Sequence, residues 1–207
     1  MEIQQAYNSW AGQYDTNINK TRDLEAHALR TSLDNLVFDS VLEVGCGTGK
    51  NTEWFITKTN FITAIDLSEE MLAKAKEKIS ATSVEFKQVD ITKPWTFRSQ
   101  QYELVSFSLV LEHIENLDQV FKETADALKP GGYVYIGELH PFKQYTGSKA
   151  RFDTDNGTQV VTCFNHHVTD FISAGKKHGL TLVDVEEYFD NNDRNEIPRI
   201  LRIIMKK

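Results

Sequence analysis

The sequence predicts an α/β fold with a doubly wound, mostly parallel sheet of seven strands and helices on both faces. Two observations support this prediction. After the first 35 residues, short apolar segments alternate with segments of helical periodicity, the pattern of a parallel sheet covered on both faces. Glycine and proline mark the junctions, as in Gly45-Cys46-Gly47-Thr48-Gly49 after the first strand and in Lys129-Pro130-Gly131-Gly132 between a helix and a strand.

The expected elements follow this alternation from end to end. Residues 1–35 are polar and helical in pattern, with aromatic side chains at Tyr7, Trp10 and Tyr14. Strands are expected at 41–45, 61–66, 83–89, 102–108, 132–138, 181–189 and 199–206, and helices at 51–58, 69–80, 116–128 and 169–178.

The alternation is interrupted after residue 139. The segments 150–153 and 158–164 are β-prone and flank Asp155-Asn156-Gly157, which predicts a β-hairpin. We therefore expect one domain over 1–207, made of an N-terminal helical lid (1–35), a ligand-binding core (36–138), a substrate flap (139–168) and a C-terminal helix with two strands (169–207).

The composition narrows the class of protein. The 207 residues carry a net charge of −7, which disfavours a nucleic-acid partner. The two cysteines lie far apart, without zinc-type spacing, as in proteins of a reducing compartment. No apolar run approaches the roughly 18 residues of a membrane span. We expect a cytoplasmic protein without membrane insertion, and its oligomeric state stays open.

The glycine-rich run after the first strand predicts a ligand site. Glycines at a strand-to-helix turn let the backbone approach a ligand closely, and the following helix offers free N–H groups. The dinucleotide fingerprint needs its third glycine at position 50, where this chain has Lys50. A nicotinamide-dependent oxidoreductase is therefore disfavoured.

Three further segments accompany this loop: Tyr-Asn-Ser-Trp-Ala-Gly-Gln-Tyr-Asp at 7–15, Leu-Glu-His-Ile at 111–114, and Leu-Lys-Pro-Gly-Gly at 128–132. With the G-x-G-x-G spacing and the acidic Glu43, they resemble the Rossmann-like class I, seven-stranded S-adenosylmethionine (SAM) methyltransferases. The nearest relatives are the small methyltransferases of type 11. The resemblance extends from about residue 35 to 138 and includes the lid helix. Many members have Asp where this chain has Glu43, and the carboxylate is retained.

The resemblance implies that the cofactor is SAM and that Asp66, at the end of the second strand, accepts from its ribose. Asp90 and Ile91 would contact adenine. A backbone carbonyl at Phe107 or Ser108 would accept from the amino group of SAM. The alternatives are helix capping for Asp66 and an ordinary turn for Asp90. The expected cofactor residues are Tyr14, Glu43, Gly45, Cys46, Gly47, Gly49, Asp66, Leu67, Met71, Asp90, Ile91 and Ser108.

Histidines are the candidate bases, because their ordinary pKa suits proton abstraction near neutrality. The expected catalytic residues are His140, His113, His166 and Tyr14, and the expected substrate residues are His140, Tyr145, Arg151 and His167. Each histidine has a structural role as its alternative, and Arg22 could also meet an anion. No metal is expected, because Glu112, His113, Glu138 and His140 match no known ligand spacing.

The function predicted from these residues is SAM-dependent methyl transfer to an O, N or C atom of a small molecule. The flap matches no general family motif, so the acceptor stays unassigned. The alternative is a catalytically inactive SAM-binding module that regulates a partner.

Overall fold

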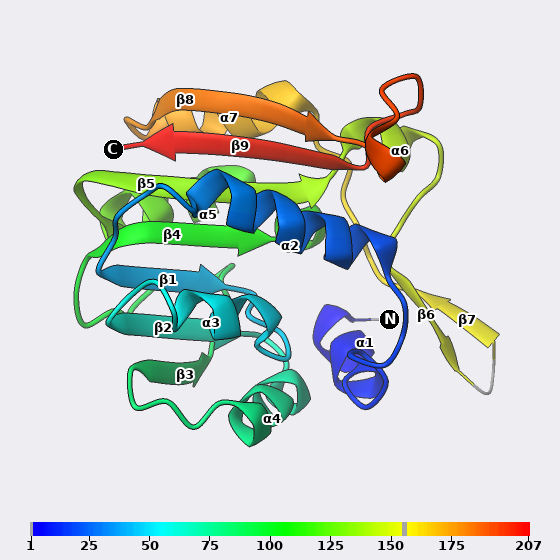
Figure 1. Ribbon diagram of the computed structural model, residues 1–207, viewed down its shortest axis with the longest axis horizontal. Helices are drawn as coiled ribbons and strands as arrows, with labels where there is room; N and C mark the ends of the chain where they lie inside the picture. Colours follow the sequence, from blue (N-terminus) through cyan, green and yellow to red (C-terminus); the bar gives the residue numbers. More distant parts are fainter. Residues whose placement is uncertain (1, 155–156) are drawn as a thin grey trace.

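The structure is a computed structural model that describes residues 2–154 and 157–207. Its main sheet has seven strands in the order β3-β2-β1-β4-β5-β9-β8, which confirms the predicted doubly wound α/β fold (Figure 1). Strands β1 to β5 are parallel, and β8 and β9 form an antiparallel pair at one edge. The strands are β1 Ser40–Val44, β2 Phe61–Asp66, β3 Val84–Gln88, β4 Tyr102–Ser108, β5 Leu128–Leu139, β8 Thr181–Tyr188 and β9 Ile200–Lys206.

Helices cover both faces of this sheet. Figure 1 shows α2 and α3 in front of the sheet and α5 and α7 behind it. The helices are α1 Ile3–Trp10, α2 Lys20–Leu33, α3 Lys50–Phe55, α4 Glu69–Lys78, α5 Leu117–Ala127, α6 Pro141–Tyr145 and α7 Val168–Lys177. In β1, Val41 belongs to the buried cluster that contains Leu29 of α2, whereas Leu42 belongs to the one that contains Phe121 of α5. Successive strand residues point to opposite faces, so both layers are anchored to one strand.

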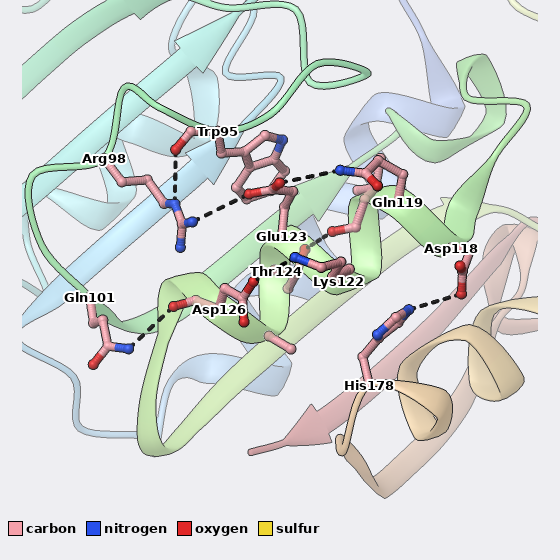
Figure 2. A network of polar contacts seen from close by, with 12 residues as sticks. Trp95, Arg98, Gln101, Asp118, Gln119, Lys122, Glu123, Thr124, Asp126 and His178 are labelled. Atoms are coloured by element: carbon pink, nitrogen blue, oxygen red, sulfur yellow. Dashed lines mark hydrogen bonds and ion pairs between the residues drawn. The ribbon is translucent and has the colours of Figure 1, made fainter.

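Polar contacts join the rear helices to their surroundings (Figure 2). Arg98, before β4, contacts Glu123 of α5 with its Nη2 at 3.3 Å from Oε2. Asp118 at the start of α5 contacts His178 just after α7, with Oδ1 at 2.8 Å from Nε2. These contacts join α5 to the segment between β3 and β4 on one side and to the end of α7 on the other.

The chain reverses direction across the sheet between β3 and β4. It builds outward from β1 to β2 and β3, then returns so that β4 pairs with the other side of β1. Ligands of such sheets bind beyond the carboxyl ends of the strands at this switch point. The ends of β1 and β4 therefore mark where a site is expected.

Helix α1 and a separate hairpin lie beyond that edge of the sheet (Figure 1). Strand β6 (Arg151–Thr154) pairs antiparallel with β7 (Gly157–Val160), so the predicted hairpin is present. Two of its expected turn residues, Asp155 and Asn156, lie outside the described residues. The Trp10 ring of α1 stacks on Phe152 of the hairpin, with centroids 5.2 Å apart and planes 15° apart.

Two local expectations were wrong. The residues Lys129-Pro130-Gly131-Gly132, expected as a turn, lie inside β5, where the register shifts opposite Tyr102 and Leu104 and Gly131 has a φ of 80°. Helix α6 was not expected. It forms because Pro141 opens it and His140 caps it, with the Phe142 N–H donating to His140 Nδ1 at 3.1 Å. Within the described residues, no helix is both long and apolar enough to cross a bilayer.

Candidate functional site

The glycine loop takes its shape from backbone conformation and from close packing. The N–H groups of Gly45 and Cys46 donate to the Ile65 carbonyl at 2.8 and 3.0 Å, which fixes the loop to the end of β2. Gly45 has a φ of 72°, and a Cβ there would collide with Val110. Gly47 has a φ of 54°, but the nearest atom to its Cβ would be Tyr14 Cε1 at 4.0 Å. Packing thus excludes a side chain at Gly45, whereas space for a ligand remains beside Gly47.

Asp66 faces this loop from the end of β2. Its Oδ2 accepts from the Gly47 N–H and its Oδ1 from the Ser68 N–H, both at 2.8 Å. The cap of helix α4 is Ser68, whose Oγ accepts from the Met71 N–H at 3.1 Å. Burial raises the pKa of Asp66, although backbone N–H groups oppose the shift. Each carboxylate oxygen keeps acceptor capacity for a further donor.

Three cavities meet at the carboxyl ends of β1 and β4. Cavity 1, of about 120 Å³, brings together most of the predicted cofactor residues. Those that line it are Tyr14, Gly45, Gly47, Asp66, Leu67, Met71, Asp90, Ile91 and Ser108. Its lining is largely apolar, with the Asp66 carboxyl at the end of β2 and the Asp90 carboxyl two residues after β3. An aromatic ring system with a polar substituent at each end suits such a surface.

Cavity 2, of about 330 Å³, is polar and shares Gly45 and Gly47 of the glycine loop with cavity 1. Two of the residues expected to contact the cofactor, Glu43 and Cys46, line it. Glu25 of α2 lines it too, although it was not expected from the sequence. Glu43 Oε2 accepts from Thr52 Oγ1 at 2.5 Å, and Glu25 Oε1 accepts from Tyr135 Oη at 3.1 Å. Burial raises the pKa of Glu25 to about 7 and that of Glu43 to about 8. A cationic ligand group would stabilise the ionised form of both.

Asn51 of α3 also lines cavity 2. Its Nδ2 lies 3.3 Å from both Glu25 Oε2 and Ser108 Oγ. Its Oδ1 is buried and lacks a hydrogen-bond partner among the described residues. This oxygen could accept from a ligand N–H group.

Cavity 3, also of about 330 Å³, lies between the N-terminal segment, the exit of β4 and the approach to β6. Among the predicted substrate residues, Arg151 lines it. Glu112 lines it too and is buried, with an exposed fraction of 5%. A volume of this size accommodates a small organic molecule.

Two residues line all three cavities, Tyr14 and Leu109. The Arg22 guanidinium lies 4.1 Å from the centroid of the Tyr14 ring, and its Nη1 donates to the Tyr14 carbonyl. Leu109 has a φ of 58°, and its N–H donates to the Gly137 carbonyl at 2.8 Å. A leucine in the left-handed region is strained, and such strain concentrates at functional sites. The three cavities therefore adjoin one another at Tyr14 and Leu109.

The predicted catalytic histidines separate in the structure. His113 lines cavity 1, with Nδ1 at 2.8 Å from the Thr162 carbonyl and Nε2 at 2.7 Å from the Tyr7 hydroxyl. His140 lines none of the three cavities, because Nδ1 caps α6 and Nε2 contacts Glu187 at 3.0 Å. Burial lowers the pKa of His140.

His166, His167 and Tyr145 also lie outside the linings of these cavities. His166 Nε2 contacts the Ile114 carbonyl at 2.7 Å, and the Tyr145 hydroxyl contacts His167 Nδ1 at 2.5 Å. Thus the geometry brings Tyr14, His113 and Arg151 to the cavities and leaves the other four predicted catalytic and substrate residues in structural contacts.

One grouping has the composition of a metal site: the ligand atoms of Glu112, His113 and Cys163 lie within 4.8 Å of one another. Both ring nitrogens of His113 already have partners, and burial raises the pKa of the Cys163 thiol to about 12. A neutral thiol is a poor ligand. We assign no metal to these residues.

Comparisons with known proteins agree with this architecture. Residues 42–136 match the family model described as a methyltransferase domain. An uncharacterized methyltransferase of Emericella nidulans is 26% identical over 221 residues, covering 88% of this chain and 77% of that protein. A ubiquinone biosynthesis O-methyltransferase of Bordetella avium is 33% identical over 102 residues, but this chain spans only 42% of its length.

A solved structure of a putative S-adenosylmethionine dependent methyltransferase from Listeria monocytogenes has the same fold. Its TM-score is 0.75 at 24% identity, covering 89% of this chain and 98% of that one.

Proposed function

We propose that the protein is a SAM-dependent methyltransferase of class I and type 11, to whose domain model residues 42–136 match, and that it binds SAM in cavities 1 and 2 and methylates a small molecule in cavity 3. One observation supports this arrangement above the others: Tyr14 and Leu109 line all three cavities. A methyl group can pass from cofactor to acceptor only where their sites touch. The acceptor atom is an oxygen, nitrogen or carbon.

The residues of cavity 1 fit the adenosine part of SAM. The Asp66 carboxylate can accept from ribose hydroxyls, and Leu67 and Met71 offer apolar surface to adenine. Asp90 lines the same cavity at the end of β3 and can accept from the adenine amino group.

The residues of cavity 2 fit the methionine part, which carries an ammonium, a carboxylate and the sulfonium. Buried Glu25 and Glu43 offer negative charge, and Asn51 Oδ1 is an acceptor without a partner in the described part of the chain. Arg22 lines the same cavity and offers a cation to the carboxylate. These groups match the three charges of the ligand in sign.

SAM supplies a methyl group already activated by its positive sulfur, so the chain's main task is to hold the acceptor close and in line. Positioning of this kind contributes on the order of 7–11 kcal/mol to lowering a barrier. As the bond from carbon to acceptor forms, the carbon–sulfur bond breaks with its electron pair left on sulfur. A hydroxyl or ammonium acceptor must also lose one proton. Two groups at the cavity walls can receive it: the Glu112 carboxylate, and His113 through the Tyr7 hydroxyl.

The experiment is calorimetry with SAM and S-adenosylhomocysteine (SAH), followed by radiolabelled methyl transfer to a panel of small metabolites. Binding of SAH together with turnover of at least one metabolite is the expected result. Binding without turnover on any acceptor would instead support a regulatory SAM-binding module. Failure of both SAM and SAH to bind would overturn the proposal.

A further inference from the structure

Cavity 3 is rich in positive charge, although the chain as a whole has a net charge of −7. Five basic residues line it, and Glu112 is the one acidic residue in its described lining. The basic residues are Lys20, Arg22, Lys149, Arg151 and Arg199. A cluster of one sign in a concave surface raises the local concentration of the opposite ion.

Some of these charges are already compensated. Arg199 is paired with Asp190 through two contacts of 2.6 Å, and its hydrogen bonds lower the pKa of that carboxyl, to which Lys20 also contributes. Lys149 and Arg151, in contrast, form no ion pair with a carboxylate of the described chain. One residue separates these two cations: Lys149 lies just before the hairpin, and Arg151 is the first residue of β6. They are available to a ligand.

Arg22 also lines cavity 3, but its charge is the one proposed above to meet the methionine carboxylate of the cofactor. Its Nη1 and Nη2 donate to the carbonyls of Tyr14 and Asn17 rather than to a carboxylate. Backbone carbonyls therefore fix its position, and Lys149 and Arg151 are the cations left for the acceptor.

Unsatisfied polar atoms gather at the same cavity. Six buried side-chain atoms lack a hydrogen-bond partner within the part of the chain described, and three of them belong to residues that line cavity 3. They are the donors Trp10 Nε1 and Arg22 Nε and the acceptor Glu112 Oε2. A buried polar atom without a partner destabilises the protein, so a ligand that supplies both an acceptor and a donor is favoured here.

We infer that the acceptor of cavity 3 is a small oxyacid: an oxyanion, carboxylate or phosphate, on a skeleton that also carries a hydroxyl or amino group. Lys149 and Arg151 bind the oxyanion, and Glu112 accepts a hydrogen bond from the hydroxyl or amino group. During transfer the new bond to the methyl carbon forms, the carbon–sulfur electron pair stays on sulfur, and the departing proton passes to Glu112 and then to water. This inference rests on the proposed function, which makes cavity 3 the acceptor site.

The test measures binding of matched probes to the SAH-loaded protein. The chain has three tryptophans, so fluorotryptophan labelling gives three ¹⁹F signals, and Trp10 is assigned from Trp10→Phe. Two pairs isolate the charge: 3-hydroxybenzoate with 3-hydroxybenzamide, and glycerol 3-phosphate with glycerol. A third comparison, benzoate with 3-hydroxybenzoate, isolates the donor.

At least one charged probe should bind about tenfold or more tightly than its neutral partner, because charge-assisted hydrogen bonds are lost in the neutral one. Which pair responds identifies carboxylate or phosphate. The double variant Lys149→Gln/Arg151→Gln should remove that preference. Arg30→Gln, an exposed arginine of α2 that lines none of the cavities, should keep it. In Glu112→Gln, 3-hydroxybenzoate should lose its advantage over benzoate.

The inference is overturned if neutral probes bind as tightly as charged ones, if no charged probe gives a saturable response, or if the double variant retains the preference. Calorimetry with SAH on the same samples separates this result from the proposed function. Loss of SAH binding in the unaltered protein would count against the function, whereas SAH binding without a charge preference counts against the oxyacid alone.

Discussion

The Tyr7 hydroxyl lies 2.7 Å from Nε2 of His113, although 106 positions separate the two residues. The Thr162 carbonyl lies 2.8 Å from Nδ1 and can only accept, so Nδ1 carries the proton and Nε2 accepts from Tyr7. Burial raises the pKa of Tyr7 well above its ordinary value, which keeps the phenol protonated. Since Tyr7 lines both cavity 1 and cavity 3, this pair links the two cavities proposed for cofactor and acceptor.

Tyr7→Phe tests that pair. The change removes one hydroxyl and leaves the ring, so SAH affinity should change little, whereas turnover should fall by about tenfold or more if the pair moves the proton. Calorimetry and steady-state kinetics measure the two effects. Tyr145→Phe is the control, because it removes a phenol hydroxyl that contacts His167 outside the three cavities. Equal turnover in both variants would leave Tyr7 with a packing role.

Gly47→Ala tests the glycine loop. A Cβ there meets no close protein atom, but φ is 54° and the methyl group would enter the space between loop and Tyr14. We expect SAH affinity to fall by about tenfold or more, with backbone strain on the order of 1–2 kcal/mol. Gly12→Ala, where nothing lies within 4 Å of the new Cβ, should leave affinity unchanged. Unaltered affinity in Gly47→Ala would contradict the assigned position of the ligand.

Asp66→Asn tests ribose recognition. The amide oxygen can retain one backbone N–H contact, but the charged acceptor is lost, at a cost of roughly 1.5–3 kcal/mol. SAH should therefore bind at least about tenfold more weakly by calorimetry. Asp126→Asn, on the rear helix α5 in Figure 2, provides the matched change away from the cavities. If the two variants bind SAH with the same affinity, the role of Asp66 is only to hold the glycine loop through the Gly47 N–H.

The buried carboxyls of cavity 2 predict a pH dependence of stability. The folded pKa values of Glu25 and Glu43, about 7 and about 8, lie above the ordinary value of 4.5, so the folded state holds protons that the unfolded state releases. Their contribution to stability is complete below pH 4.5 and is lost as the pH rises through 7 to 8. Glu43→Gln should flatten this decline, by an amount on the order of 1–3 kcal/mol.

Urea unfolding of the ligand-free protein at several pH values between 5 and 9 measures that slope. Glu53→Gln on the neighbouring helix is the control, because Glu53 is exposed. An identical slope in Glu43→Gln would mean that Glu43 is ionised in the folded protein throughout. SAM should stabilise the protein most at the alkaline end, where both carboxylates are charged.

Much of the fold could be predicted because its strands are apolar and its junctions contain glycine or proline. That Asp66 and Asp90 share a cavity could be predicted as well, since both follow strands that end at the same edge of the sheet. The direction in which individual side chains point could not be predicted. His140 does follow β5 at the expected edge, but α6 begins at Pro141 and uses the imidazole as its cap. Glu25 was missed because its place in cavity 2 depends on how α2 packs against Tyr135 of β5, a contact 110 positions apart in the chain.

The stacking of Trp10 on Phe152 has a kinetic consequence. It joins α1, which lines cavities 1 and 3, to the hairpin, whose Arg151 lines cavity 3, and each aromatic ring buries roughly 150–250 Å². Drawing α1 away from the hairpin exposes both rings to water at once. Since residues of α1 line both cavity 1 and cavity 3, we expect one movement of this helix to open both cavities together.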